Sequence, residues 1–134
     1  MRALRETDKA EWSALWSAYL TFYETSRPAE IHDLYFQRLL GDENRDGRLG
    51  GLTHYLFHRH GWSRENVCYL QDLYADPAVR GQGIGRALIE GVYAAADAAG
   101  APSVYWLTQD FNKDARLLYD RIGVKTPFIK YSRA

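Results

Sequence analysis

The chain has 134 residues and a mass of 15.4 kDa, enough for one domain with a core of its own. Its 17 basic and 17 acidic residues cancel, so no global field draws it to nucleic acid or to an anionic membrane. The lone cysteine, Cys68, excludes an intrachain disulfide and a thiolate zinc cluster. No apolar run approaches the roughly 20 residues of a membrane span, and residues 1–6 lack a signal-peptide core. We therefore expect a single soluble, cytoplasmic domain over residues 1–134, without a nucleic-acid or membrane partner.

The first part of the chain predicts helices. Asp8 followed by Glu11 is typical of a helix start, and Arg27-Pro28 ends the pattern, which gives a helix over about residues 9–24. Residues 31–39 predict a second, shorter helix, and 41–51 a polar loop. The apolar stripe of the first helix consists of Trp12, Leu15, Trp16, Tyr19, Leu20 and Tyr23.

The remainder alternates strand and helix patterns. Residues 49–59 and 67–75 are rich in apolar and aromatic side chains, and the short turn between them favours an antiparallel hairpin. A helix over 83–99, with Ile84, Leu88, Val92, Ala95, Ala96 and Ala99 toward the core, then leads to a buried strand over 104–108. A helix over 112–122 and a terminal strand near 128–131 complete the expected elements. The order predicts an α/β fold with a mixed sheet.

The loop between residues 75 and 84 carries the most specific motif. A strand ends at Asp76-Pro77, then Arg80-Gly81-Gln82-Gly83-Ile84-Gly85 opens a helix. A helix N-terminus with glycines before it favours bound phosphate. The kinase-type phosphate loop is excluded because Arg86-Ala87 stands where Lys and Ser or Thr belong, and the glycine spacing does not fit a dinucleotide fingerprint. The acyl-CoA pattern [QR]-x-x-G-x-[GA] does fit.

A second motif supports the first. Asn112, Ala115 and Tyr119 follow the predicted strand at the spacing found in GNAT acyl-CoA N-acyltransferases, and with the glycine loop the chain resembles that superfamily over about residues 67–123. The resemblance implies a GNAT fold: a mixed, mostly antiparallel central sheet flanked by about four helices and splayed at the cofactor site. It also implies acetyl-CoA as cosubstrate.

The resemblance assigns residues to that cosubstrate. Tyr119 is implied as the general acid for the leaving thiolate, since a phenol of pKa about 10 stays protonated at neutral pH. The strand end is implied to pair with the pantetheine arm, with a backbone N–H of Leu73 or Tyr74 polarising the thioester carbonyl. The implied cofactor-binding residues are Leu73, Tyr74, Ala75, Arg80, Gly81, Gln82, Gly83, Ile84, Gly85, Arg86, Asn112 and Ala115.

The acceptor side resembles the diamine and polyamine branch, which includes spermidine/spermine and thialysine acetyltransferases. Tyr23-Glu24 matches a Tyr-Glu pair that binds the cationic substrate there, whereas that branch reads Leu-Glu-Asp where this chain has Leu70-Gln71-Asp72. Gln71 can orient water but cannot accept a proton. Asp72, Glu24 or a water chain are left as proton acceptors, and we take Asp72 as the catalytic candidate.

Other features have plainer interpretations. His54, His58 and His60 share a strand face, but no acidic or cysteine ligand follows at metal-site spacing, so we expect no metal. Trp12, Trp16 and Tyr19 suit core packing better than a substrate wall. A strand usual in the superfamily has no counterpart between 41 and 49. Relatives pair through their C-terminal strands, which predicts a homodimer.

Three functions follow. The preferred one is direct transfer of an acetyl group from acetyl-CoA to a primary amine of a small polyamine, diamine or amino-acid-like molecule. A protein or histone-like N-acetyltransferase is the alternative within the class. A non-catalytic acyl-CoA sensor is the alternative outside it, because Gln71 replaces the usual glutamate.

Overall fold

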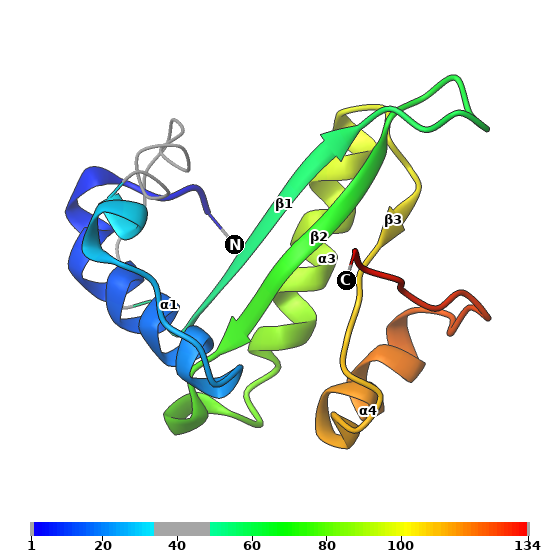
Figure 1. The fold of residues 1–134 in the computed structure, drawn as a ribbon. Coiled ribbons are helices and arrows are strands. Elements are labelled where there is room, and N and C mark those ends of the chain that lie inside the picture. The colour runs from blue at the N-terminus through cyan, green and yellow to red at the C-terminus, as the bar shows by residue number, and fades with distance from the viewer. Residues whose placement is uncertain (1, 34–48, 134) are drawn as a thin grey trace.

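An antiparallel hairpin forms the centre of the fold (Figure 1). A computed structural model describes residues 2–33 and 49–133. In it β1 (Gly51–His58) pairs with β2 (Val67–Ala75), and β2 pairs in parallel with the short β3 (Val104–Tyr105), so the strand order is β1-β2-β3. The expected hairpin and mixed sheet are confirmed, and β2 has the predicted bounds.

Helices cover both faces of this hairpin (Figure 1). The 3₁₀ turn η1 (Glu6–Asp8) leads into α1 (Lys9–Phe22), which packs on one face. The 3₁₀ turn η2 (Pro77–Val79) follows β2 and leads to α3 (Ile84–Ala98), which packs on the other face. Helix α4 (Lys113–Ile122) follows β3, and residues 29–33 are helical. The sheet with helices on both sides confirms the α/β class.

Each helix layer has its own apolar cluster. Ile89 is fully buried at the centre of the α3 face, although the predicted stripe omitted it. The α1 cluster consists of Trp12, Leu15, Trp16, Leu20 and Leu52. The α3 cluster consists of Cys68, Leu70, Ile89, Val92 and Ala96, with side chains of α4 packed at its edge.

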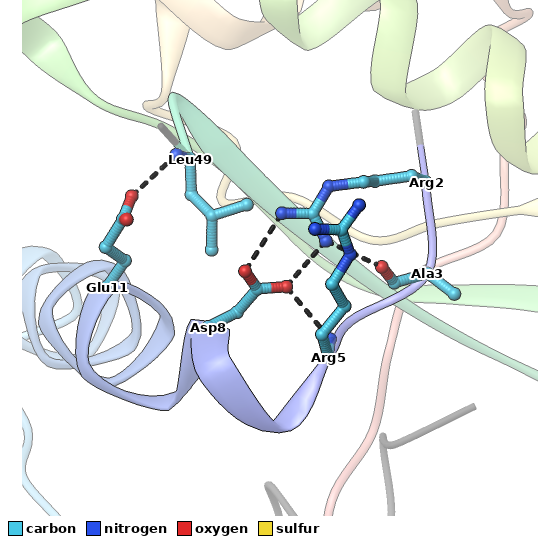
Figure 2. A network of polar contacts seen from close by, with 6 residues as sticks. All are labelled: Arg2, Ala3, Arg5, Asp8, Glu11 and Leu49. Carbon is cyan, nitrogen blue, oxygen red and sulfur yellow. Dashed lines mark hydrogen bonds and ion pairs between the residues drawn. The ribbon is translucent and has the colours of Figure 1, made fainter. Parts of the chain in front are cut away.

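The N-terminus of α1 differs from the predicted Asp8–Glu11 cap. Asp8 makes no side-chain cap bond to α1 and instead accepts hydrogen bonds from Arg2 Nη1 at 2.6 Å and from the Arg5 backbone N–H at 2.9 Å (Figure 2). The bond from Arg2 is the main reason that the pKa of Asp8 is lowered. Glu11 accepts a 2.7 Å bond from the backbone N–H of Leu49. Asp8 therefore holds the preceding N-terminal residues against the start of α1, whereas Glu11 holds a distant segment onto the helix.

Several predicted elements are shorter or missing. The strand expected over 104–108 covers only β3, because the chain turns away from β2 after Tyr105. The strand predicted near 128–131 is wrong: this segment is irregular, with Phe128 78% and Tyr131 86% exposed. The prediction of a helix over 31–39 falls only partly within the described residues. Residues 41–48, where a strand was in question, lie outside them.

Candidate active site

The glycine loop adopts the backbone conformation that its sequence predicts. Asp76 accepts a bond from the Ala78 N–H and starts η2, so the chain reverses after β2. Gly81 has φ 79° and Gly83 has φ 77°, in the left-handed region that side chains with a Cβ disfavour. Gly83 is the N-cap of α3 and no side chain caps this end. The N–H groups of the first helical turn are therefore available to an anion.

Two of the three glycines leave open space and the third does not. A Cβ added at Gly81 or Gly83 would meet no atom within 4 Å, so a diphosphate can approach the backbone there. A Cβ at Gly85 would lie 3.2 Å from Leu118 Cδ2 of α4. Gly85 thus serves the close approach of α4 to α3. This approach sets the distance between the loop and Tyr119, which is the next residue of α4.

The charged and polar side chains of the loop face solvent. Arg80 and Gln82 are exposed, and Ile84 is half-buried at the helix start. Arg86 donates a 2.7 Å bond to Glu90 one turn later, so its guanidinium is held on the outer face of α3. Arg80 is accordingly the better placed of the two cations to supplement the backbone amides.

The sheet splays before the loop, along the second half of β2. β2 and β3 pair only at Cys68 with Val104 and at Tyr69 with Tyr105. Beyond Tyr69, β2 continues to Ala75 while β3 leaves it. The splay that the resemblance implied is therefore present, and within residues 2–33 and 49–133 no strand pairs with this edge of β2 along residues 73–75.

Hydrogen-bond alternation decides which amides face that open edge. The N–H of Asp76 donates to Gly50 O at 2.9 Å, toward the β1 side. N–H groups alternate between the two edges of a strand, so that of Tyr74 also points to β1 and that of Leu73 points to the splay. Of the two donors that the resemblance left open for the thioester carbonyl, the backbone favours Leu73.

A β-bulge in β2 determines which face of the sheet the Asp72 side chain occupies. His54 is opposite Asp72 and Tyr55 is opposite Leu70, so Gln71 is an extra residue on β2. An extra residue reverses which face the following side chains take. Leu70 faces α3, and after the bulge Asp72 and Tyr74 face α1. In a regular strand without this bulge, Asp72 would share the face of Leu70 and point into the α3 cluster.

Asp72 is buried among hydrogen-bond donors. It is 5% exposed. Its Oδ1 accepts a 2.6 Å bond from the Tyr19 hydroxyl, and its Oδ2 lies 2.9 Å from His54 Nδ1 and 3.5 Å from Gln71 Nε2. Both carboxylate oxygens therefore lie within hydrogen-bond reach of a donor. The carboxylate is therefore fixed in place behind the Tyr19 hydroxyl.

The partners of His54 define its tautomer. Trp12 Nε1 lies 3.2 Å from His54 Nε2, and an indole N–H can only donate. His54 Nε2 therefore accepts, and the single ring proton of the neutral imidazole is on Nδ1, directed at Asp72. His54 is 4% exposed and Trp12 is fully buried.

Tyr119 lies half-buried on α4 and faces the apolar cluster of α3. Its ring packs edge-on against Trp106, with 5.6 Å between centroids. Burial, with a smaller contribution from the charge of Tyr23, raises the pKa of Tyr119 to about 12. The pKa of Tyr23 is itself raised, mainly by burial and then by the charge of Asp72.

The predicted acceptor residues Tyr23 and Glu24 lie at the C-terminal end of α1. The N–H of Thr25 donates to Leu20 O and that of Glu24 to Thr21 O, the Schellman pattern of a helix end. Glu24 occupies the left-handed position of this motif with φ 54°, where glycine is usual, and its side chain is exposed. Tyr23 packs against Tyr19, with ring centroids 4.9 Å apart.

Asn112 and Ala115 belong to the start of α4. Asn112 is the N-cap, and its Oδ1 lies 3.5 Å from the Ala115 N–H. Their spacing of three residues is that of a capping bond, which gives the motif a structural role in addition to any contact with a ligand.

The sequence interpretation missed three side chains of the hydrogen-bond network around Asp72: Tyr19, His54 and Trp12. Tyr19 and Trp12 follow the helical stripe, so packing alone explained them, and His54 was grouped with His58 and His60. The structure separates these histidines, because His58 bonds to the Tyr105 hydroxyl at 2.9 Å and His60 lies beyond the end of β1. The usable signal was a histidine at a core-facing position of a strand.

Two general observations concern residues 2–33 and 49–133. No three histidine, cysteine or acidic side chains in these ranges come together in a way that suits a metal ion. None of the helices found there has the length and apolarity needed to cross a bilayer.

Comparisons with known proteins agree with this geometry. The model of the acetyltransferase (GNAT) family matches residues 1–124. The chain is 36% identical over 143 aligned residues to the D-amino-acid N-acetyltransferase HPA3 of Saccharomyces cerevisiae, covering 99% of this chain and 89% of that protein. It is also 37% identical over 71 residues to the thialysine N-epsilon-acetyltransferase of Bos taurus, covering 53% of this chain and 41% of that protein.

Solved structures share the fold at low identity. AAC(6')-Iy in complex with the bisubstrate analog CoA-S-monomethyl-acetylneamine superposes with a TM-score of 0.81 at 17% identity, covering 99% of this chain and 95% of that one. The ribosomal-protein-alanine N-acetyltransferase of Brucella melitensis biovar Abortus 2308 gives a TM-score of 0.76 at 22% identity, covering 98% and 95%. The chain therefore belongs to the acetyltransferase (GNAT) family, enzymes that take the acetyl group from acetyl-CoA.

Proposed function

We propose that the protein transfers an acetyl group from acetyl-CoA to the primary amine of a small, amino-acid-like molecule, by direct attack of the amine. The observation that carries this proposal is the position of the glycine loop: it follows the part of β2, beyond Tyr69, that β3 no longer pairs with. The open edge of β2 therefore leads directly, through the loop, to the anion-binding start of α3. A diphosphate followed by an amide-containing arm suits both features.

The loop and the strand edge are proposed to bind different parts of acetyl-CoA. Backbone amides at Gly81 to Gly85 and the Arg80 side chain are proposed to hold the diphosphate, with Arg86 contributing through its own amide. The open edge of Leu73 to Ala75 is proposed to pair with the pantetheine arm, near Asn112 and Ala115. The bound thioester supplies the electrophilic carbonyl, toward which the Leu73 N–H is directed.

Tyr119 is proposed as the general acid. The raised pKa of its phenol, about 12, keeps the hydroxyl protonated throughout the physiological range. A protonated phenol can donate to a thiolate as the carbon–sulfur bond breaks. The approach of α4 to α3 at Gly85 supports this role, because it brings the helix that carries Tyr119 to the end of the loop, where α3 starts.

Asp72 is proposed as the final proton acceptor, reached through Tyr19. The carboxylate is buried, so an amine meets the Tyr19 hydroxyl before it meets Asp72. The hydroxyl oxygen accepts a proton from the ammonium group while its own proton passes to Asp72 Oδ1. The products are a neutral amine, an intact tyrosine hydroxyl and a protonated carboxyl group. Gln71 contributes an amide hydrogen bond rather than a proton acceptor.

The acceptor is proposed to be an amino acid or a similar amine. The supporting relatives are a D-amino-acid N-acetyltransferase and a thialysine N-epsilon-acetyltransferase, and both names specify amino-acid amines. Glu24, exposed at the end of α1, is proposed to attract the cationic group, and Tyr23 to line the path toward Asp72. Three further expectations stay predictions from the sequence: a single domain over 1–134, a cytoplasmic location and a homodimer.

The test is release of free thiol from acetyl-CoA, measured with D- and L-amino acids, thialysine, polyamines and a basic peptide. We expect turnover with one class of small amine and weak or no turnover with the peptide. Preference for the peptide supports the alternative, protein acetylation. Binding of acetyl-CoA by calorimetry without thiol release for any amine rejects the enzyme and supports a sensor.

A further inference from the structure

We propose that His54 and Trp12 are positioning residues for the Asp72 carboxylate, and that they belong to the acceptor side of the active site rather than to the core alone. This inference rests on the proposed function of Asp72. It concerns two residues that the sequence placed in the core or on a strand face.

The proposal begins with a continuous chain of hydrogen bonds. It runs from Trp12 Nε1 to His54 Nε2 at 3.2 Å and from His54 Nδ1 to Asp72 Oδ2 at 2.9 Å. At the other carboxylate oxygen, the Tyr19 hydroxyl donates to Asp72 Oδ1 at 2.6 Å. Donors on both oxygens hold the carboxylate against rotation. Because the indole occupies Nε2, the imidazole proton must stay on Nδ1, where it fixes Oδ2.

Packing requirements do not account for this chain of hydrogen bonds. Leu52 lies on the same face of β1, two residues before His54, and contributes to the same cluster as an apolar side chain. A buried polar group costs free energy that an apolar residue avoids, so a histidine at this position needs another reason. Its position opposite Asp72, beyond the bulge at Gln71, supplies that reason.

At its Tyr19 end, the chain of hydrogen bonds reaches the predicted acceptor residues. The Tyr19 ring packs against Tyr23 at 4.9 Å and edge-on against Tyr74 at 6.4 Å between centroids. Tyr74 belongs to the part of β2 that leads into the glycine loop. The chain therefore connects the core beneath α1 with the region between the acceptor and cosubstrate sides.

Several titratable groups surround His54 in the described part of the chain. Asp72 faces it from β2, and Tyr19 reaches it from α1 through Asp72. His32 lies edge-on to Trp12 at 6.3 Å between ring centroids. The charge of Asp72 also contributes to the raised pKa values of Tyr23 and Tyr69, after burial as the main cause. Protonation of His54 at Nε2 would have to displace the indole N–H.

The first experiment compares His54→Asn with His54→Leu. The Asn amide can donate to Asp72 from about the place of Nδ1, whereas Leu cannot. We expect His54→Leu to lower kcat about tenfold or more, as for a misplaced proton acceptor, and His54→Asn to recover most of that loss. The KM for acetyl-CoA should stay unchanged in both. Equal losses of kcat in the two variants would overturn the proposal.

The second experiment uses Trp12→Phe, which keeps an aromatic ring and removes only the donor. Nε2 then becomes open to a proton, so the acid limb of the kcat profile should move to higher pH. Leu52→Val is the control, since it loosens the same cluster without touching the chain and should keep the wild-type profile. A Trp12→Phe profile that superposes on the wild type contradicts the positioning role.

A third measurement needs neither activity nor a variant. Nitrogen NMR of the wild-type protein should show His54 neutral, with its proton on Nδ1. A proton on Nε2 overturns the proposal even if every variant is folded and active. If no amine is acetylated, the proposed function fails, and the NMR result still decides whether His54 orients Asp72.

Discussion

His54 Nδ1 lies 2.9 Å from Asp72 Oδ2, directly across the β1–β2 ladder. The two side chains meet because Gln71 is a bulge, which turns Asp72 to the face that α1 covers. The acid of the acceptor side is thus positioned by one extra backbone residue. The following predictions test the main parts of the site and of the fold that holds it.

Tyr119→Phe should lower kcat by about 100-fold or more, because it removes the proposed proton donor and keeps the ring packed on Trp106. The KM for acetyl-CoA should change little. Tyr93→Phe is the matched control: this half-buried tyrosine also packs on Trp106, and it bonds to Ile122 O at 2.9 Å. Steady-state kinetics should show a normal kcat for the control. A wild-type kcat in Tyr119→Phe would remove this residue from the mechanism.

The alkaline stability of the protein should depend on Tyr119. Burial raises its pKa to about 12, so the folded state holds the phenol proton more tightly than the unfolded chain, whose pKa is about 10. This contribution to stability is complete below about pH 10 and is lost as the pH rises through the folded value. Chemical denaturation at rising pH should show a steeper alkaline loss in the wild type than in Tyr119→Phe. Parallel curves would contradict the shift.

Gly83→Ala should raise the KM for acetyl-CoA. Its φ of 77° is unfavourable for alanine and costs about 1–2 kcal/mol, and the new methyl group would project into the open space beside the backbone amides. Gly100→Ala provides the control, because Gly100 has φ 66° and equally open surroundings at the far end of α3. Both variants should lose similar stability in thermal unfolding, and only Gly83→Ala should bind acetyl-CoA more weakly in calorimetry.

Glu24→Gly should separate stability from acceptor binding. Glycine relieves the left-handed conformation at φ 54° and should stabilise the protein by about 1 kcal/mol. Removal of the carboxylate should raise the KM for a cationic amine. Glu24→Gln removes the charge and keeps the backbone strain, so it should share the KM effect without the gain in stability. An unchanged KM in both variants would exclude Glu24 from acceptor binding.

Asp8→Asn should destabilise the protein at neutral pH by about 1–3 kcal/mol, because it breaks the bonds that hold Arg2 and the Arg5 backbone (Figure 2). The pKa of Asp8 is lowered, so its contribution is present above the ordinary value of 3.8 and is lost as the pH falls through the folded value. Denaturant midpoints of the variant and the wild type should therefore converge in acid. A constant difference across that range would show that the charge is not involved.

The sequence by itself determined most of the helices and strands and the backbone conformation of the glycine loop. The order of strand, glycine loop and helix is local, and glycine at positions 81 and 83 is required by the local backbone. The hairpin, α1, α3 and α4 follow from apolar periodicity, which needs no knowledge of neighbours. The terminal strand near 128–131 failed because an apolar run does not specify a pairing partner.

Only the tertiary structure decided which side chains surround Asp72 and which face of the sheet Asp72 occupies. Whether Asp72 faces α1 or α3 depends on the bulge at Gln71, which follows from how β1 and β2 register against each other. Trp12, Tyr19 and His54 are distant from Asp72 in sequence and become its neighbours only after α1 packs on the hairpin. Hydrogen bonds between such residues depend on positions to within fractions of an ångström, and periodicity along one chain does not contain that information.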